Sequence, residues 1–145
     1  GSAKLLIENS AGAGKIIGSD FGQIGKILEI AQKFPAFGGI CLDTQHSFAS
    51  GYDWINNFDA AFKKLDENIG IENIKLMHSN DSLTNLNSHK DRHAHIGKGK
   101  IGLEGFKKLT AFAQKNGIDM ICETAYPGVI EDIKRLKEMR NNNAK

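Results

Sequence analysis

The segment Gly39-Ile40-Cys41-Leu42-Asp43 is a short apolar run that ends in a carboxylate. Near-continuous apolar residues over this length leave no face for solvent, which is typical of a buried strand in a parallel sheet. The same pattern recurs at three other places, Lys4-Leu5-Leu6-Ile7-Glu8, Ile74-Lys75-Leu76-Met77-His78 and Asp119-Met120-Ile121-Cys122-Glu123. The sequence therefore predicts four buried, parallel strands.

Each predicted strand is followed by a segment with helical periodicity, at about 20–34, 57–69, 103–115 and 128–140. Ser19 or Asp20 stands where an N-cap belongs, and Gly70 and Gly117 stand where helices end. Strictly alternating βα units imply a parallel sheet with right-handed crossovers. Two architectures have this order: an open doubly wound sheet, and a (βα)₈ barrel, of which four units make half.

The glycines after the first predicted strand argue against a dinucleotide-binding sheet. Ala11-Gly12-Ala13-Gly14 supplies the first two glycines of the phosphate-binding fingerprint. The third stands at Gly18, one residue too late for that motif.

The composition describes one ordinary domain. A chain of 145 residues has room for a single domain, which can bury a core without disulfides. Its two cysteines are too few for a disulfide framework or a cysteine-based zinc knuckle. A net charge of +2 is too small to indicate nucleic acid by bulk electrostatics. We predict a domain over residues 4–140, a cloning remnant or linker over 1–3, and a disordered tail over 141–145.

The distribution of apolar residues indicates the cellular compartment in which the protein is expected. The longest apolar runs, such as Leu5-Leu6-Ile7, are only a few residues long, whereas a membrane helix needs about 18. The N-terminus also lacks the charged and apolar regions of a signal peptide. We therefore expect an intracellular, cytoplasmic protein.

A side chain able to bind metal ends each predicted strand, one βα unit after the previous one: Glu8, Asp43, His78 and Glu123. In parallel α/β folds the carboxyl ends of all strands lie at one face, which carries the active site. Three carboxylates and an imidazole gathered there would repel one another without a cation, and with a divalent ion they suit zinc, manganese or iron. Alternatively, each acidic residue only caps the helix that follows it. Four such residues in register favour the metal site.

A second set of candidate ligands lies in the loops on the same face. His46 follows the strand-end Asp43 by one short turn. Asp91 and His93 stand at positions i and i+2, so an extended segment would project both to one side. Together, His46, Asp91 and His93 are a mixed nitrogen and oxygen set typical of zinc with a position left for water or phosphate. His95 continues the same rhythm and is a rival to His93.

Other residues have simpler interpretations. We expect Cys41 and Cys122, inside strands, to be buried structural thiols, and His89, in a polar loop, to have no role. Aromatic residues that recur every four positions are best explained as the core side of a helix: Trp54, Phe58 and Phe62. Basic residues crowd the loop that carries the second ligand set, where they would contact phosphate: Lys90, Arg92, Lys98 and Lys100.

Five ordered segments are specific enough to compare with a known family. They are Leu6-Ile7-Glu8-Asn9-Ser10-Ala11-Gly12, Cys41-Leu42-Asp43-Thr44-Gln45-His46-Ser47-Phe48-Ala49-Ser50-Gly51-Tyr52-Asp53, His78-Ser79-Asn80-Asp81-Ser82, Asp91-Arg92-His93 followed by Ile96-Gly97-Lys98-Gly99-Lys100-Ile101-Gly102, and Ile121-Cys122-Glu123-Thr124. These segments resemble the endonuclease IV family of apurinic/apyrimidinic endonucleases. The resemblance runs from about Lys4 to Met139. It implies an α/β fold of four parallel βα units, the C-terminal half of the family's (βα)₈ TIM barrel.

The resemblance implies a zinc-dependent DNA repair enzyme. The family binds three zinc ions and hydrolyses the phosphodiester on the 5′ side of an abasic site in double-stranded DNA. By motif, Glu8 would bridge the first and second ions, and Glu8 and Glu123 would be the catalytic residues. The second ion would be completed by Asp43, His78 and Glu123, and the third would be held by His46, Asp91 and His93. The residues expected to contact DNA are Arg92, Lys98 and Lys100.

The resemblance also implies that this chain lacks part of the family's site. The remaining ligands of the first ion are two histidines of the N-terminal half, so at most two zinc ions are expected per chain, against three in a complete barrel. We expect the chain to be weakly active alone. We also expect it to pair with a missing N-terminal half or with itself, because an unclosed barrel leaves edge strands and an apolar face uncovered.

Two other functional classes remain open. A metal-dependent sugar isomerase or epimerase of the related xylose-isomerase-like barrels also gathers strand-end carboxylates and a histidine around one metal ion, but it needs no second ligand set. A non-catalytic half-barrel that binds metal or a partner chain would show the same strand ends.

Overall fold

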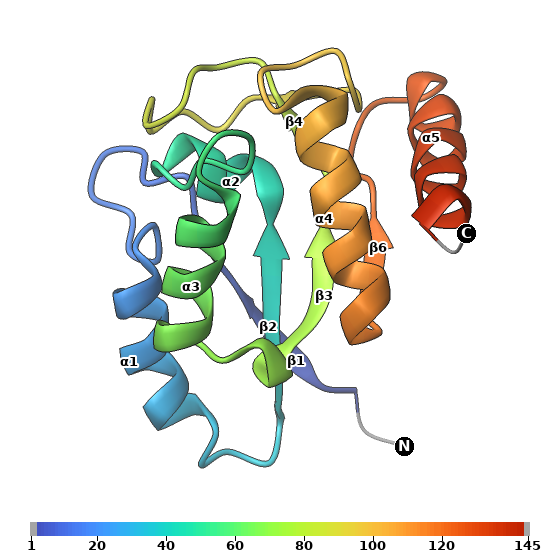
Figure 1. Ribbon diagram of the computed structural model, residues 1–145. Coiled ribbons are helices and arrows are strands. Elements are labelled where there is room, and N and C mark those ends of the chain that lie inside the picture. The colour runs from blue at the N-terminus through green and yellow to red at the C-terminus, as the bar shows by residue number, and fades with distance from the viewer. Residues whose placement is uncertain (1–2, 144–145) are drawn as a thin grey trace.

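The computed structural model describes residues 3–143. Four strands form one sheet, namely β1 (Leu5–Glu8), β2 (Phe37–Asp43), β3 (Ile74–His78) and β6 (Asp119–Ile121). They lie in chain order, β1-β2-β3-β6, and each neighbouring pair is parallel (Figure 1). The predicted arrangement of four parallel βα units is confirmed.

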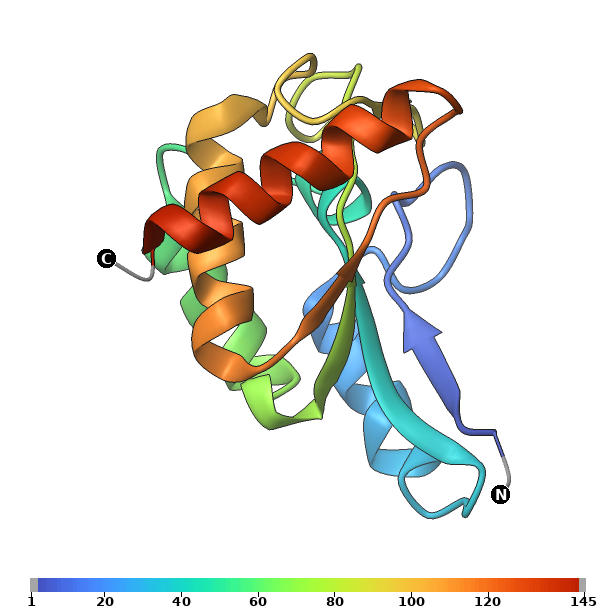
Figure 2. The same cartoon turned by 90° about the vertical axis from the view of Figure 1, so that its right-hand side faces the viewer.

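Four long helices follow the strands: α1 (Phe21–Ala31), α3 (Phe58–Asn68), α4 (Gly102–Asn116) and α5 (Gly128–Asn143). Helices α1, α3 and α4 lie on one face of the sheet, and α5 packs beside α4 next to β6 (Figures 1 and 2). Within residues 3–143, no helix covers the opposite face (Figure 2). Half of a TIM barrel has this form, with helices outside and an open inner face. None of the helices described is both long and apolar enough to cross a membrane.

The helix ends follow the predicted capping residues. Asp20, rather than Ser19, caps α1, because its Oδ1 accepts hydrogen bonds from the amides of Gly22 at 2.9 Å and Gln23 at 3.3 Å. Gly117 ends α4 in the left-handed conformation, with φ 65°. A glycine adopts this conformation without the steric cost that a Cβ imposes.

Three short elements were missed by the sequence patterns. They are helix α2 (Thr44–Ala49), the 3₁₀ turn η1 (Ile71–Asn73), and a two-stranded hairpin of β4 (Asp81–Ser82) and β5 (His93–Ala94). Each is too short for a hydrophobic period to be recognised.

The C-terminal boundary also differs from the expectation. Helix α5 extends through Asn143, so residues 141–143 are helical and not a tail, since no glycine or proline interrupts the helix after its first residue. Residues 1–2 of the expected remnant at 1–3, and residues 144–145 of the expected tail, lie outside the described residues.

The core lies between the sheet and the helices. The side chains of Ile40 and Met77, on the two central strands, are completely buried. Phe58 and Phe62 pack against this core, which confirms that the aromatic series belongs to the core. Trp54 is fully buried but precedes α3 instead of lying in it, and its ring centroid is 5.8 Å from that of Phe58.

The sheet ends at β1 on one side and at β6 on the other. Apolar side chains on both edge strands are exposed to solvent, at 68% for Leu5 and 47% for Ile121. Exposed apolar edge strands offer unpaired backbone groups to a further strand. The sheet is therefore open at the two places where a complete barrel would continue.

We predict that Asp20→Ala lowers the free energy of unfolding by about 1 kcal/mol, because it removes the acceptor for two amides at the start of α1. Urea denaturation measures the difference. Glu29→Ala, on an exposed position of the same helix, is the matched control. Equal stability of the two variants would contradict the assigned cap.

Candidate metal centre

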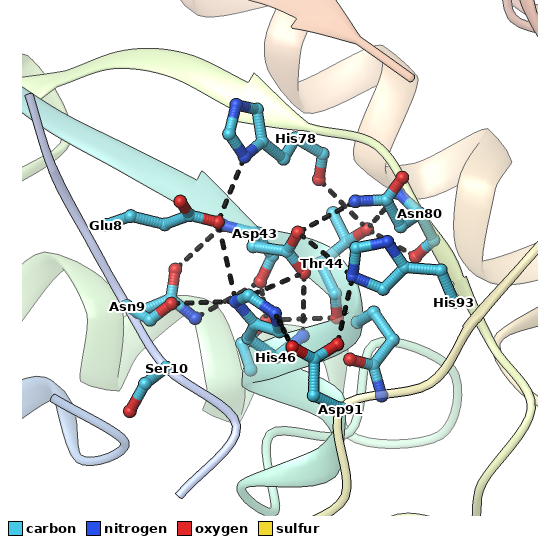
Figure 3. A network of polar contacts seen from close by, with 12 residues as sticks. Glu8, Asn9, Ser10, Asp43, Thr44, His46, His78, Asn80, Asp91 and His93 are labelled. Atoms are coloured by element: carbon cyan, nitrogen blue, oxygen red, sulfur yellow. Dashed lines mark hydrogen bonds and ion pairs between the residues drawn. The ribbon is translucent and has the colours of Figure 1, made fainter. Parts of the chain in front are cut away.

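The four strand-end residues lie together at the carboxyl edge of the sheet. Figure 3 shows three of them, Glu8, Asp43 and His78. Asp43 and His78 are paired in register at the ends of β2 and β3, and Glu123 follows β6 by two residues. The Nδ1 of His78 is 3.0 Å from Glu8 Oε1 and 3.1 Å from Glu123 Oε2. One ligand atom from each of the four residues lies within 4.8 Å of the others. We call Glu8, Asp43, His78 and Glu123 the strand-end group.

A second group lies beside the first. It consists of His46 on α2, His93 on β5 and the loop residue Asp91, together with Asp43, whose ligand atom lies within 4.8 Å of those of both histidines. The carboxylate of Asp91 stands between the two rings, with Oδ2 3.3 Å from His46 Nε2 and Oδ1 3.3 Å from His93 Nε2 (Figure 3). We call this set the loop group. Asp43 belongs to both groups, which the sequence patterns did not predict.

Two nitrogen atoms of the loop group form no hydrogen bond, although each lies 3.3 Å from an oxygen of Asp91. Within the described residues, four buried side-chain polar atoms are unpaired, and two of them are the Nε2 atoms of His46 and His93. A buried polar atom left unpaired is costly, so such an atom calls for an explanation. The Nδ1 of His46 is 2.9 Å from the carbonyl oxygen of Asn9. Because a carbonyl only accepts, this Nδ1 carries the proton, and Nε2 of the neutral ring presents a lone pair suited to a metal ion.

Two asparagines hold the ligands in place. The Nδ2 of Asn80 donates to Asp43 Oδ2 at 2.8 Å and to Glu123 Oε2 at 3.0 Å, and its Oδ1 accepts from the Glu123 amide at 3.0 Å. Asn9 pairs with the backbone of Asp43 through both ends of its amide. Both asparagines are buried, and sequence reasoning assigned neither a role. The only available signal was their position just after a strand end.

Closely spaced carboxylates and imidazoles determine the electrostatics of the site. Burial raises the pKa of the Asp43 carboxyl, since the charged form is taken out of water. Burial also acts to lower the pKa of His46, but the Asp43 carboxylate, the hydrogen bond to the Asn9 carbonyl, and the carboxylates of Asp91 and Glu8 together outweigh it and raise the pKa. Several carboxylates therefore face two imidazoles over a few ångströms, which favours a positive ion between them.

His95 and His89 lie outside both groups. The Nδ1 of His95 is 2.6 Å from Asp132 Oδ2, on the side of α5. Of the two rival histidines, His93 lies in the loop group and His95 does not. His89 is exposed, and neither ligand group includes it.

The basic loop surrounds a buried carboxylate. Asp81, which is completely buried, accepts hydrogen bonds from the amides of Gly97, Gly99 and Ile101 at 2.9 to 3.0 Å. The side chains of Lys98 and Lys100 alternate with these amides and are exposed. Lys90 and Arg92 are exposed on the preceding segment. The four basic residues are thus exposed, Lys90 and Arg92 directly beside Asp91 in the chain, and Lys98 and Lys100 in the loop that binds Asp81.

A family model described as a xylose isomerase-like TIM barrel matches residues 2–141. The chain belongs to this family. Its curated relatives include "Probable endonuclease 4" of Cenarchaeum symbiosum, which is 39% identical over 94% of the chain and 49% of that protein. A second, "Probable endonuclease 4" of Thermoplasma volcanium, is 44% identical over 85% of the chain and 42% of its own length.

The solved structures agree with the curated relatives. The crystal structure of endonuclease IV from Thermus thermophilus superposes with a TM-score of 0.80 at 27% identity, over 95% of this chain and 50% of that one. The chain spans about half the length of the relatives that it matches. The predicted resemblance to endonuclease IV, and the fold of half a TIM barrel, are confirmed.

We predict that the thiols react slowly in the folded protein. Burial and the nearby Glu8 carboxylate raise the pKa of Cys41 to about 12, and burial and Asp132 raise that of Cys122 to about 11. Because only the thiolate is nucleophilic, modification of Cys41 by a chromogenic disulfide at pH 8 should be at least about a hundredfold slower than in guanidinium. Equal rates in the native and unfolded protein would show that Cys41 is not the buried structural thiol assigned here.

Proposed function

We propose that this chain forms the metal-binding half of a DNA repair endonuclease of the endonuclease IV type, which hydrolyses the phosphodiester 5′ to an abasic site. The observation that carries the proposal is the loop group, in which two buried, unpaired imidazole nitrogens flank one carboxylate. A one-metal sugar isomerase has no use for this second group. The printed names of the relatives support the same choice.

Zinc fits the two ligand groups. Imidazole nitrogen and carboxylate oxygen are a mixed donor set that zinc accepts readily. One ion would be held by the strand-end group, and one by His46, Asp91 and His93. The neutral form of His46 has the lone pair that such an ion requires.

Phosphodiester hydrolysis needs an activated water and neutralisation of the charge that develops on the phosphate oxygens, and bound divalent ions supply both. The chain would contribute by holding the metal ligands of both groups close together. Glu8 Oε1 lies 3.0 Å from His78 Nδ1 and 3.4 Å from His46 Nδ1, so it stands between the two groups. Glu123 completes the strand-end group from the opposite side. We assign the catalytic role to Glu8 and Glu123 as ligands that touch the reacting centre.

The substrate is double-stranded DNA with an abasic site. Arg92, Lys98 and Lys100 are exposed and would contact DNA phosphates. Binding through phosphate contacts weakens as salt is raised, because condensed counterions must be displaced.

The partner of this chain would be the N-terminal half of the barrel, and a second copy is the alternative. Both edge strands carry exposed apolar residues, and one face of the sheet lacks a helix within residues 3–143. Closure of the barrel would pair β1 and β6 with further strands and cover that face. Without closure, part of the DNA-binding surface is missing, and we propose that the chain alone is weakly active.

We predict that the chain binds at most two zinc ions. Asp43→Ala should lower the zinc content because Asp43 belongs to both groups, whereas His89→Asn, outside them, should not. Elemental analysis after dialysis measures the content. Three tightly bound ions per chain, or unchanged content in Asp43→Ala, would overturn the ligand assignment.

We predict that this chain with zinc incises an abasic duplex weakly or not at all, and that adding the N-terminal half of an endonuclease IV restores incision. The missing half would contribute to stabilising the transition state, and a higher substrate concentration cannot replace that contribution. Glu123→Gln should abolish the restored incision, while Glu138→Gln, exposed on α5, should not.

The controls separate two kinds of failure. Strong cleavage by this chain alone would remove the claim that it is incomplete. No cleavage after the other half is supplied would favour the isomerase or the non-catalytic half-barrel.

A further inference from the structure

Asp132 is a buried carboxylate that neither ligand group contains. It lies near the start of α5, on the outside of the sheet, yet it is only 1% exposed. Its Oδ1 accepts from the amide of Ile96 at 2.8 Å, and its Oδ2 accepts from His95 Nδ1 at 2.6 Å and from Thr124 Oγ1 at 2.5 Å. Three donors satisfy the hydrogen-bonding capacity of a carboxyl group that is shielded from water.

The three donors come from the two segments that carry ligands. His95 and Ile96 directly follow β5, which contains His93 of the loop group. Thr124 directly follows Glu123 of the strand-end group. One carboxylate on α5 therefore connects to one segment of each ligand group.

Neither segment is held firmly by the sheets alone. β5 pairs only with β4 over two residues, and β6 ends at Ile121, two residues before Glu123. Additional contacts from α5 reinforce the connection. Arg135 donates to the carbonyl of Ile96, and the His95 ring lies so close to Gly128 that a Cβ there would overlap it. His95 is thus fixed between Asp132 and the first turn of α5.

We propose that Asp132 is a positioning residue for both ligand groups, acting through His95 on His93 and through Thr124 on Glu123. The inference rests on the proposed metal function. Groups that orient metal ligands commonly change metal affinity 10- to 100-fold when they are removed, because the ligands lose their orientation. A purely structural contact would instead lower stability and leave the affinity of the folded protein unchanged.

The proposal predicts that each donor controls a different group. Thr124→Val removes the hydroxyl at nearly constant volume and should weaken zinc binding by the strand-end group about tenfold. His95→Leu removes the ring nitrogen and should weaken binding by the loop group about tenfold. Thr124→Ser and His95→Asn each keep a donor and should restore most of the affinity.

The two groups can be measured separately in the full chain. His46→Ala disables the loop group, and Glu123→Gln disables the strand-end group. Zinc affinity, determined by competition with a chromophoric chelator, should fall for Thr124→Val only in the His46→Ala background. It should fall for His95→Leu only in the Glu123→Gln background. Unfolding in urea without zinc reports any loss of stability separately.

The outcomes separate this inference from the proposed function. The crossed pattern, with rescue by the conservative variants, supports the inference. Zinc binding that is normal in every variant, or that falls equally in both backgrounds, overturns the inference alone. A parent chain that binds no zinc overturns the proposed function and this inference with it.

Discussion

The carboxylate of Asp43 is the interaction on which the rest of the site depends. One oxygen accepts from the His46 amide at 2.7 Å and so starts α2, and the other accepts from Asn80 at 2.8 Å. Capping and ligation are therefore not alternatives at this position. By capping α2, Asp43 places His46 one turn away from itself, and by facing Asn80 it joins the ligands of β3 and β6. A single buried charge thus organises two groups that come from five different segments of the chain.

Much of the fold could be predicted because buried parallel strands have a simple signature. The runs ending at Glu8, Asp43 and His78 are almost continuously apolar, although Leu5 at the sheet edge is exposed, and the helices between them are long enough to show a period. Asn80, Asp81 and Asp132 could not be predicted in the same way. A polar residue in a short connection, a two-residue strand or a helix gives no sign of burial, which depends on donors brought by distant segments. His93 and His95 show the same limit, because both fit the i, i+2 rhythm but β5 ends at Ala94, between them.

The open sheet separates metal binding from barrel closure. Both candidate ligand groups lie within residues 8 to 123, while β1 and β6 are the exposed edges of the sheet. The relatives that the chain matches are about twice its length. Ligands at the ends of the central strands are held by the core and by Asn9 and Asn80. Glu8 ends the edge strand β1 and Glu123 follows the edge strand β6, although Asn80 also hydrogen-bonds Glu123. Closure of the barrel would therefore add neighbours beside these two carboxylates.

The basic loop shows how a site with many carboxylates can still face a phosphate. The charge of Asp81 is satisfied by backbone amides of the loop, including those of Gly97, Gly99 and Ile101. Within the described residues, Lys98 and Lys100 form no ion pair with an acidic side chain. A loop that used a lysine to neutralise Asp81 would hold that lysine in an ion pair. Because backbone amides serve instead, Lys98 and Lys100 stay exposed, and under the proposed function they can attract a phosphate toward a centre whose own side chains are largely acidic.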